Sequence, residues 1–593
     1  MRSAAAGTSF RKITLYSPTM PATPAPTLAP EALANLAERY WRQQCEEHPL
    51  QAIMAGEPCQ AVELFRAAPE DHERRARQAR ELRNELATLA PRGLSIQDCA
   101  THRLLEFELD DAIALHEVHA HLRPPLLPVG PDFSAIHLAN SVTIAQRAEA
   151  ELYVERLARF PHYLRDLRAC LQAGIGLGLR YPRLVVDGAM AMVRAGVRGD
   201  PAQHSWLGPL RRSPVAHQLQ RLTSSAERLV REELIPAWHA HAAQLAELLS
   251  PAARDSIACT DDVRGAAFYS ACLRHYSSLD MPADQIHELG RSEVARLERE
   301  AAALATEAGF GGDAKAYRVW LASEASFIAP DADALLRQTE SLAKRVDKCI
   351  PGFFRRTPRM TFGIELIPEA MAPRMPLAYA QPNPADRSAP GIYWLTCIPA
   401  RCPGYMQLPT LLHEAWPGHL MHMALIQEST TLPAFRRHGA LKYSACLEGW
   451  AMYCEKLGVE MGLYRSVHER YGRLELEMMR AARLVVDTGI HARGWSREQA
   501  IGFMSERMAM DRAAIAAEVD RYIGLPGQAV AYQLGQLRIS ALRARADALP
   551  EGRRDVRAFH DIVLSSGPLA LPVLDEIVED WLERGEPSAA SHA

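Results

Sequence analysis

A short apolar stretch of this sequence carries three histidines and a glutamate within ten residues. It reads LLHEAWPGHLMH and runs from Leu411 to His422. Imidazole is the commonest protein ligand for zinc, and a glutamate directly after a ligand histidine is how helical zinc hydrolases position a general base. The stretch therefore predicts a zinc-hydrolase helix with His413 as a ligand and Glu414 as the base. The alternative is a core helix that carries partly buried histidines.

The spacing between His413 and His419 is unusual for such a helix. Zinc-binding histidines usually stand four residues apart, whereas these two are six apart and would point about 120° away from each other on a regular helix. Pro417 and Gly418 lie between them, and a local bulge or kink there would bring His419 beside His413. A rival arrangement uses His419 and His422, and it would leave Glu414 too far back to act on the zinc-activated water.

A second acidic segment supplies a candidate third ligand. It reads EGWAMYCE, and its two glutamates, Glu448 and Glu455, are seven residues apart and so point the same way from one helix. A catalytic zinc takes three protein ligands and leaves a fourth position for water. Glu448 suits the third position, and Glu455 could orient a ligand histidine. The alternative is a solvated helix face, but the residues from Tyr443 to Leu457 are mostly aromatic, small or apolar.

The pairing of HEAWPGH with EGWAMYCE resembles the bacterial "domain of unknown function 885" family. Members of that family are similar to helical glutamate-zincin metallopeptidases, which include Taq-type carboxypeptidases, thimet-type oligopeptidases and angiotensin-converting enzyme. The resemblance implies a zinc site of His413, His419 and Glu448, with Glu414 as base. It covers nearly all of the chain past residue 35, including residues 151–186, 281–300, 480–495, 526–538 and 559–569.

This chain departs from the family pattern at one place. The family usually reads PGHHxQ, whereas Leu420 replaces the second histidine here and His422 stands where glutamine is usual. Since His422 is three residues past His419, the two are neighbours on a regular helix. His422 could shape substrate preference or compete as a ligand.

The resemblance also implies helper residues from the C-terminal region. Related peptidases stabilise the oxyanion with a tyrosine and a histidine, and Tyr532 and His560 occupy the matching segments. Gln536 lies one turn after Tyr532, and Arg538 could meet a peptide C-terminal carboxylate with its forked guanidinium. The structural alternatives are a core aromatic for Tyr532, a surface ion pair for Arg538 and a helix cap for His560.

Composition narrows the class of partner. The formal net charge is −4, and the chain has no Lys/Arg block and no apolar run long enough to span a bilayer. These features argue against nucleic acid or a membrane as the main partner. The N-terminus lacks the apolar region of a signal peptide, and the odd number of 11 scattered cysteines is typical of free thiols in a reducing compartment. We therefore expect a cytoplasmic protein; the sequence leaves open whether it forms a homodimer.

The pattern along the chain predicts a mainly α fold. Apolar residues recur at three- and four-residue spacing in most segments, and only residues 361–366 and 391–397 resemble strands. We expect a two-lobed, zinc-peptidase-like helical body with a small β-sheet beside the active-site helix. An edge strand there could pair with an extended peptide; otherwise the strands form a packing hairpin. The expected parts are a disordered lead (1–30), a helical lobe (31–285), a catalytic lobe (286–584) and a loose tail (585–593).

These observations predict a zinc-dependent hydrolase that cleaves amide bonds of short peptides. An exopeptidase of carboxypeptidase or dipeptidase type fits best, since a deep cleft between helical lobes admits chains more readily than folded proteins. The alternative enzyme is a zinc amidohydrolase acting on a non-standard amide in a biosynthetic or detoxification route. A non-catalytic scaffold is the third reading, and the presence of all four motif residues argues against it.

Overall fold

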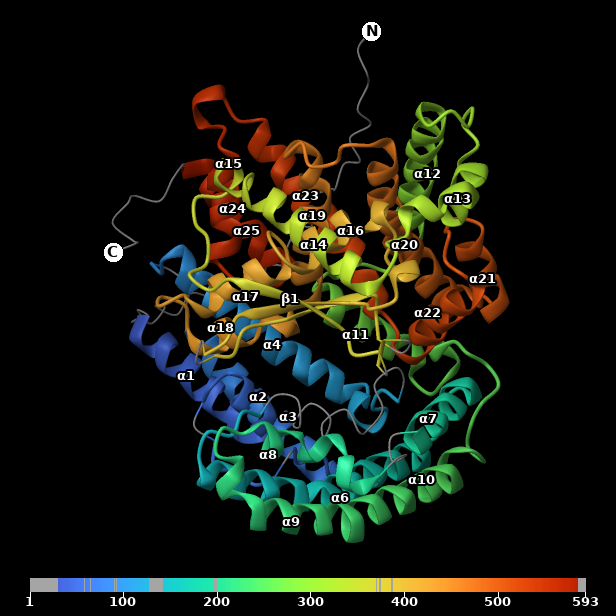
Figure 1. The fold of residues 1–593 in the computed structure, drawn as a ribbon. Helices are drawn as coiled ribbons and strands as arrows, with labels where there is room; N and C mark the ends of the chain where they lie inside the picture. Colours follow the sequence, from blue (N-terminus) through green and yellow to red (C-terminus); the bar gives the residue numbers. More distant parts are fainter. Residues whose placement is uncertain are drawn as a thin grey trace.

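The computed structural model describes residues 30–126, 142–195 and 200–584, apart from residues 58, 64, 90, 92, 370, 373, 374, 386 and 387. The expected lead and the expected loose tail lie outside these residues, except that Pro30 begins the first helix. Helices make up most of the regular structure, so the predicted mainly α fold is confirmed (Figure 1). None of the helices in the described part of the chain is both long enough and apolar enough to cross a lipid bilayer.

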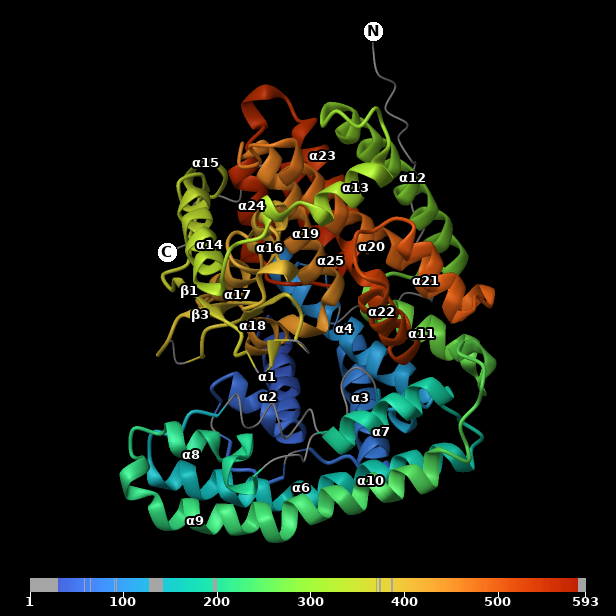
Figure 2. The same cartoon turned by 45° about the vertical axis from the view of Figure 1, so that its right-hand side comes forward.

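The helices before residue 280 form the lower part of the molecule as drawn in Figures 1 and 2. In both views α6, α9 and α10 form the bottom layer, and α1 to α4 lie between that layer and the C-terminal helices. Their bounds are α1 Pro30–Glu47, α2 Pro49–Met54, α3 Pro69–Ala87, α4 Ile96–Glu117, α6 Arg147–Gly176, α7 Arg183–Ala195, α8 Gly208–Arg212, α9 Gln220–Leu229, α10 Ile235–Leu249 and α11 Gly265–Ser277.

The remaining helices form the upper part and surround the predicted zinc motif. Their bounds are α12 Ala283–Glu307, α13 Ala314–Ser323, α14 Ala332–Asp347, α15 Ile350–Phe353, α16 Gly404–Glu414, α17 His419–Gln427, α18 Ala434–His438, α19 Ser444–Glu460, α20 Val467–Arg493, α21 Arg497–Ser505, α22 Arg512–Gly524, α23 Ala531–Asp547, α24 Val556–Ser565 and α25 Leu571–Arg584.

A three-stranded sheet lies beside α16 and α17. It consists of β1 (Phe362–Leu366), β2 (Ala378–Gln381) and β3 (Gly391–Leu395), in the order β1-β3-β2. Both predicted strands are therefore present, but they pair in parallel, and so they do not form a hairpin. The strand β2, which lies between them in the sequence but at the edge of the sheet, pairs antiparallel with β3. Sequence analysis missed β2 because it is four residues long and only one of those residues, Tyr379, is β-branched or aromatic.

Alternation along β3 explains how the sheet meets the helices. Gly391, Tyr393 and Leu395 are buried, while the residues between them are half-buried. A side chain at Gly391 would come within 2.9 Å of Leu420 in α17. The buried face of the sheet therefore packs against the zinc-motif helices, as expected from the sequence.

One hydrophobic core joins the two ends of the chain. Its buried residues run from Leu33 in α1 to Leu582 in α25, and they include Leu411 and Leu412 of α16 and Trp450 of α19. The predicted boundary near residue 285 falls close to the start of α12, and this core contains residues from both sides of it. The helices of the bottom layer bury a separate cluster around Phe160 and Trp238.

Glycines allow the central helices to approach each other closely. A Cβ at Gly535 of α23 would overlap the carbonyl oxygen of Ala445 in α19, and it would lie 2.9 Å from the Cα of Gly449. Likewise, a Cβ at Gly290 of α12 would come within 2.6 Å of Leu484 in α20. The contact between α19 and α23 matters most for the site, because Glu448 directly precedes Gly449.

We expect Gly535→Ala to destabilise the protein by about 1–3 kcal/mol, the usual cost of overpacking a tight contact. Gly502 of α21 is a matched control, because an added Cβ there meets nothing within 4 Å. Gly502→Ala should leave stability unchanged or raise it by up to about 1 kcal/mol, since alanine favours helix. Denaturant unfolding of both variants measures the difference. Equal stability of the two variants would contradict the close contact.

Candidate metal centre

The helix is interrupted between the two halves of the HEAWPGH motif. Helix α16 ends at Glu414, and α17 begins at His419. The residues between them leave the helical region, with ψ of −121° at Ala415 and −134° at Gly418. The expected bulge within one helix is therefore a full break between two helices. Pro417 follows a cis peptide bond, and its carbonyl oxygen accepts a hydrogen bond of 2.9 Å from the indole of Trp450.

Only glycine fits at the end of this break. A Cβ at Gly418 would overlap the carbonyl oxygen of His413 and would lie 2.5 Å from that of Leu412. Gly418 therefore lets the chain fold back against the last turn of α16. This close return is what places the first residue of α17, His419, beside His413.

His413, His419 and Glu448 converge on one point. The Nε2 atoms of both histidines lie 3.4 Å from Oε2 of Glu448, and the two rings are perpendicular with centroids 4.8 Å apart. Ligand atoms of a tetrahedral zinc site with bonds of about 2.1 Å are about 3.4 Å from one another, so this set fits a zinc ion. Within the described residues it is the one group of three potential ligands that lie close enough to share an ion. The rival pairing of His419 with His422 is not formed.

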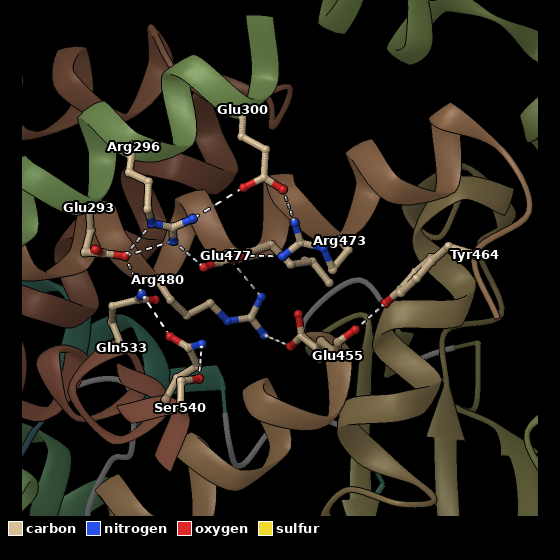
Figure 3. Close-up of polar contacts among 12 residues, drawn as sticks. Glu293, Arg296, Glu300, Glu455, Tyr464, Arg473, Glu477, Arg480, Gln533 and Ser540 are labelled. Carbon is tan, nitrogen blue, oxygen red and sulfur yellow. Dashed lines mark hydrogen bonds and ion pairs between the residues drawn. The ribbon is translucent and has the colours of Figure 1, made fainter. Parts of the chain in front are cut away.

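Glu455 orients the first of these histidines. Nδ1 of His413 donates a hydrogen bond of 2.7 Å to the Glu455 carboxylate, which leaves the lone pair of Nε2 directed at the centre. Glu455 is 2% exposed, and Nη2 of Arg480 lies 3.7 Å from the same carboxylate oxygen (Figure 3). The hydroxyl of Tyr464 donates to the backbone carbonyl of Glu455 at 2.7 Å. These contacts fix both the tautomer and the orientation of His413.

A partly buried ion-pair network joins α20, the helix that carries Arg480, to α12. Figure 3 shows Arg473 and Glu477 of α20 meeting Arg296 and Glu300 of α12. Arg296 lies 2.5 Å from Glu477 and 3.3 Å from Glu300, and it also pairs with Glu293 at 2.8 Å. The network anchors α20 behind the centre, so Arg480 reaches Glu455 from a fixed helix.

The charges at the centre reinforce one another. Burial alone would lower the pKa of His413, but the hydrogen bonds to Glu448 and Glu455 outweigh it and raise that pKa to about 9. Burial would raise the pKa of Glu448, yet the two histidines hold it well below its ordinary value. Burial raises the pKa of Glu414 above its ordinary value. A carboxylate with a raised pKa is suited to accept a proton near neutral pH.

Comparison with known proteins identifies the family. The sequence matches the family described as "Bacterial protein of unknown function (DUF885)" over residues 49–578. The chain belongs to this family. No curated protein matches the sequence.

Two solved structures resemble this DUF885 chain. A "putative lipoprotein" from Colwellia psychrerythraea superposes with a TM-score of 0.87 at 26% identity, over 93% of this chain and 99% of its own. A "putative lipoprotein of unknown function" from Shewanella oneidensis superposes with a TM-score of 0.72 at 16% identity, over 92% of this chain and 99% of its own. At that identity the second likeness shows the fold alone.

Tyr532, one of the predicted helper residues, lies within the electrostatic influence of Glu448 in the candidate metal centre of this DUF885 protein. It lies in the first turn of α23, three residues before the glycine that contacts α19. Burial raises its pKa, and the nearby charge of Glu448 raises it further. The guanidinium of Arg483 stacks on its ring at 4.7 Å. A tyrosine hydroxyl beside Glu448 can donate a hydrogen bond to a developing oxyanion.

Two other predicted residues, Gln536 and Arg538, are bonded to neighbouring side chains. Gln536 is buried, donates to Ser540 at 3.0 Å and accepts from Gln533 at 3.3 Å. Arg538 binds the carboxylate of Asp575 in α25 through Nε at 2.6 Å and through Nη2. Neither side chain is directed at the metal centre. Gln536 finds its partners within α23, and Arg538 finds its partner across to α25. Their contact with substrate stays a prediction.

His560 serves as a bridge in the core. Its Nδ1 donates to the carbonyl of Phe353 at 2.8 Å, and its Nε2 accepts from the hydroxyl of Tyr453 at 2.7 Å. The side chain is 0% exposed, and both ring nitrogens are used. No nitrogen is left to donate to an oxyanion, so the position matches the structural alternative more closely than the predicted catalytic role.

His422 lies one turn after His419, packed in the interior. It is 0% exposed, its ring meets Trp450 edge-on at 6.0 Å, and neither nitrogen has a partner among the described residues. Burial lowers its pKa to about 3. The structure therefore places His422 beside the ligand set but outside it, as a neutral imidazole.

Sequence reasoning missed the residues behind Glu455. Arg480 and Tyr464 complete its surroundings, but neither belongs to a ligand motif. The sequence does carry one sign of these residues. Along one face of a helix whose other residues are mostly apolar, charged residues recur at helical spacing: Arg473, Glu477 and Arg480. Charges in such a position must be paired when the helix is buried.

Acid stability provides a test of the role of His560. Burial lowers its folded pKa from 6.5 to about 3. Between these values the unfolded chain binds a proton that the folded protein does not, so stability falls as the pH drops through this window. His560→Gln should flatten the dependence of unfolding free energy on pH between 4 and 6 by up to about 1.4 kcal/mol per pH unit. Exposed His239 supplies the control variant, His239→Gln. An unchanged slope in His560→Gln would contradict its burial as a neutral group.

Proposed function

We propose that this protein is a zinc-dependent hydrolase that cleaves amide bonds of short peptides as an exopeptidase. The observation that carries the proposal is the convergence of two imidazole nitrogens on one carboxylate oxygen, each at 3.4 Å, with Glu414 next to the first ligand. Two histidines and one glutamate form a catalytic zinc set, which leaves a position for water. Bound zinc would supply Lewis-acid activation of the water and of the amide carbonyl.

The residues around this set have distinct roles in the proposal. Glu414 accepts the proton of the attacking water and returns it to the departing amine. Tyr532 donates its hydroxyl to the oxyanion that forms on the carbonyl. Glu455 holds His413 in the tautomer that binds metal, and Arg480 holds the Glu455 carboxylate in place.

The wider likeness to helical zinc peptidases belongs to the same proposal. The two-lobed body expected from the sequence stays a prediction, and a cleft at the metal centre would suit a short flexible substrate. The cytoplasmic location expected from the cysteines stays a prediction, as does the oligomeric state.

Metal analysis is the first test. We expect one zinc ion per chain, and Glu448→Ala should lose it because one of three ligands is gone. Glu455→Gln should retain the site but weaken zinc binding by about 10- to 100-fold, the usual effect of altering a residue that orients a ligand. Elemental analysis and chelator competition measure both effects. Purified protein without a bound transition metal that also fails to take up zinc would refute the metal assignment.

Glu414→Gln separates chemistry from binding. The variant should keep its zinc and its thermal stability but lose at least about 100-fold in turnover of short peptides, since a general base contributes that much or more. Glu365 on β1 is an exposed carboxylate away from the centre, so Glu365→Gln serves as the matched control. Near-normal turnover by Glu414→Gln would show that another group accepts the proton.

A further inference from the structure

A pair of arginines on α20 and α22 lies against Tyr532. The pair consists of Arg483 and Arg521, and both guanidiniums bind the same carboxylate oxygen, Oε2 of Glu518. The Nη2 atoms of Arg483 and Arg521 lie 2.9 Å and 3.1 Å from that oxygen, and the hydroxyl of Tyr522 donates to it at 2.8 Å. One oxygen atom therefore accepts from three donors.

The arginine pair carries one positive charge more than its carboxylate compensates. Glu518 is the single carboxylate that binds either guanidinium directly in the described part of the chain. Arg521 otherwise donates to the neutral amide of Gln528, and Arg483 donates through Nε to the hydroxyl of Tyr522 at 3.0 Å. The side chain of Arg483 is only 7% exposed. An excess charge held this far from bulk water favours binding of a further anion.

The arginine pair also has a donor atom that could bind such an anion. Nη1 of Arg483 makes no hydrogen bond to any residue that the structure describes. The Arg483 guanidinium lies over the ring of Tyr532, 4.7 Å from its centroid, and that of Arg521 lies over Tyr522, 4.9 Å from its centroid. Planar donors fixed in this way are suited to a carboxylate, which guanidinium recognises through paired hydrogen bonds.

Tyr532 connects the arginine pair to the metal centre. One face of its ring carries Arg483, and its hydroxyl lies within the electrostatic influence of Glu448. The backbone contact between Gly535 and Gly449 holds α23 and α19 together one turn from Tyr532. A substrate with its amide at the metal centre would therefore have the arginine pair one side chain away, beyond Tyr532.

We propose that Arg483 and Arg521 bind the C-terminal carboxylate of the peptide substrate, so that the enzyme removes residues from the C-terminal end. This inference rests on the proposed peptidase function. It replaces Arg538, which the sequence suggested for the same task and which Asp575 already occupies. In this role the substrate carboxylate compensates the second positive charge of the arginine pair, which Glu518 alone does not balance.

A matched pair of peptides provides the first part of the test. An N-acetylated tripeptide is prepared as the free acid and as the C-terminal amide, and each is incubated with zinc-loaded protein with and without chelator. We expect the acid to be cleaved at least about 100-fold more efficiently in kcat/KM, because the amide lacks the charge that the arginine pair would bind. Equal, chelator-sensitive cleavage of both peptides would overturn this inference and leave the peptidase function standing.

Variants provide the second part. Arg521→Gln should raise KM for the acid by about 10- to 100-fold with little change in kcat, zinc content or cleavage of the amide, and Arg521→Lys should restore part of the loss. Arg545 of α23 pairs with Glu579 at the surface, so Arg545→Gln is the control. Arg521 is chosen because Arg483 is more deeply buried, and melting temperatures check that the variants fold. An Arg521→Gln variant that matches the control would overturn the assignment.

A binding measurement covers the case in which neither peptide is cleaved. Such a result would refute the peptidase function. Calorimetry with zinc-loaded wild-type protein then decides the carboxylate site on its own. Tighter binding of the acid than of the amide, lost in Arg521→Gln, would support the site. Equal binding of acid and amide, or no binding of either, would overturn it.

Discussion

Glu455 is buried against His413, so the surrounding helices have to supply cations and hydrogen-bond donors that compensate its charge. A carboxylate that is 2% exposed is strongly destabilising unless cations and hydrogen-bond donors compensate it. Arg480 and the ring of His413 provide that compensation, and Arg480 is itself placed by the ion pairs that join α20 to α12. The ion pairs that join α20 to α12 hold three carboxylates (Glu293, Glu300, Glu477) and two guanidiniums (Arg296, Arg473). Arg480 and Glu455 form a separate pair, and a metal cation bound through His413 would add positive charge beside it.

Close contacts between helices fix the positions of the side chains at the centre. Gly418 folds the chain back onto α16, and Gly449 and Gly535 let α19 meet α23 backbone to backbone. A larger side chain at any of these positions would shift a ligand or Tyr532 by a large fraction of a bond length. Sites that must hold reacting groups within about 0.5 Å depend on rigid supports of this kind.

The convergence of the three candidate ligands, with Glu414 next to the first, could be predicted from the sequence because the information is local. His413, Glu414, His419 and Glu448 lie in two short segments, and a Pro-Gly pair signals the departure from a regular helix. The break into α16 and α17 is sharper than expected because Gly418 returns against two carbonyls of the preceding turn, a contact that spacing alone does not reveal. Gln536, Arg538 and His560 differ in this respect. The partners of Arg538 and His560, such as Asp575 and Phe353, come from distant parts of the chain. Those of Gln536 are local, since Gln533 and Ser540 lie on the same helix, but only the packed structure shows that all three side chains are already bonded.

Two charged groups near the centre differ in the balance of their charges. The α12–α20 network has three glutamates for two arginines, whereas the pair of arginines on α20 and α22, next to Tyr532, shares one glutamate. Because both groups belong in part to α20, one buried helix sets the direction of the local field. A peptide whose carbonyl reaches the centre while its terminal carboxylate points toward the arginine pair is aligned with that field, and the reverse orientation would place its carboxylate nearer to Glu448. If the protein acts on peptides as proposed, the charges on α20 would favour one direction of the substrate chain, in addition to any contact with individual side chains.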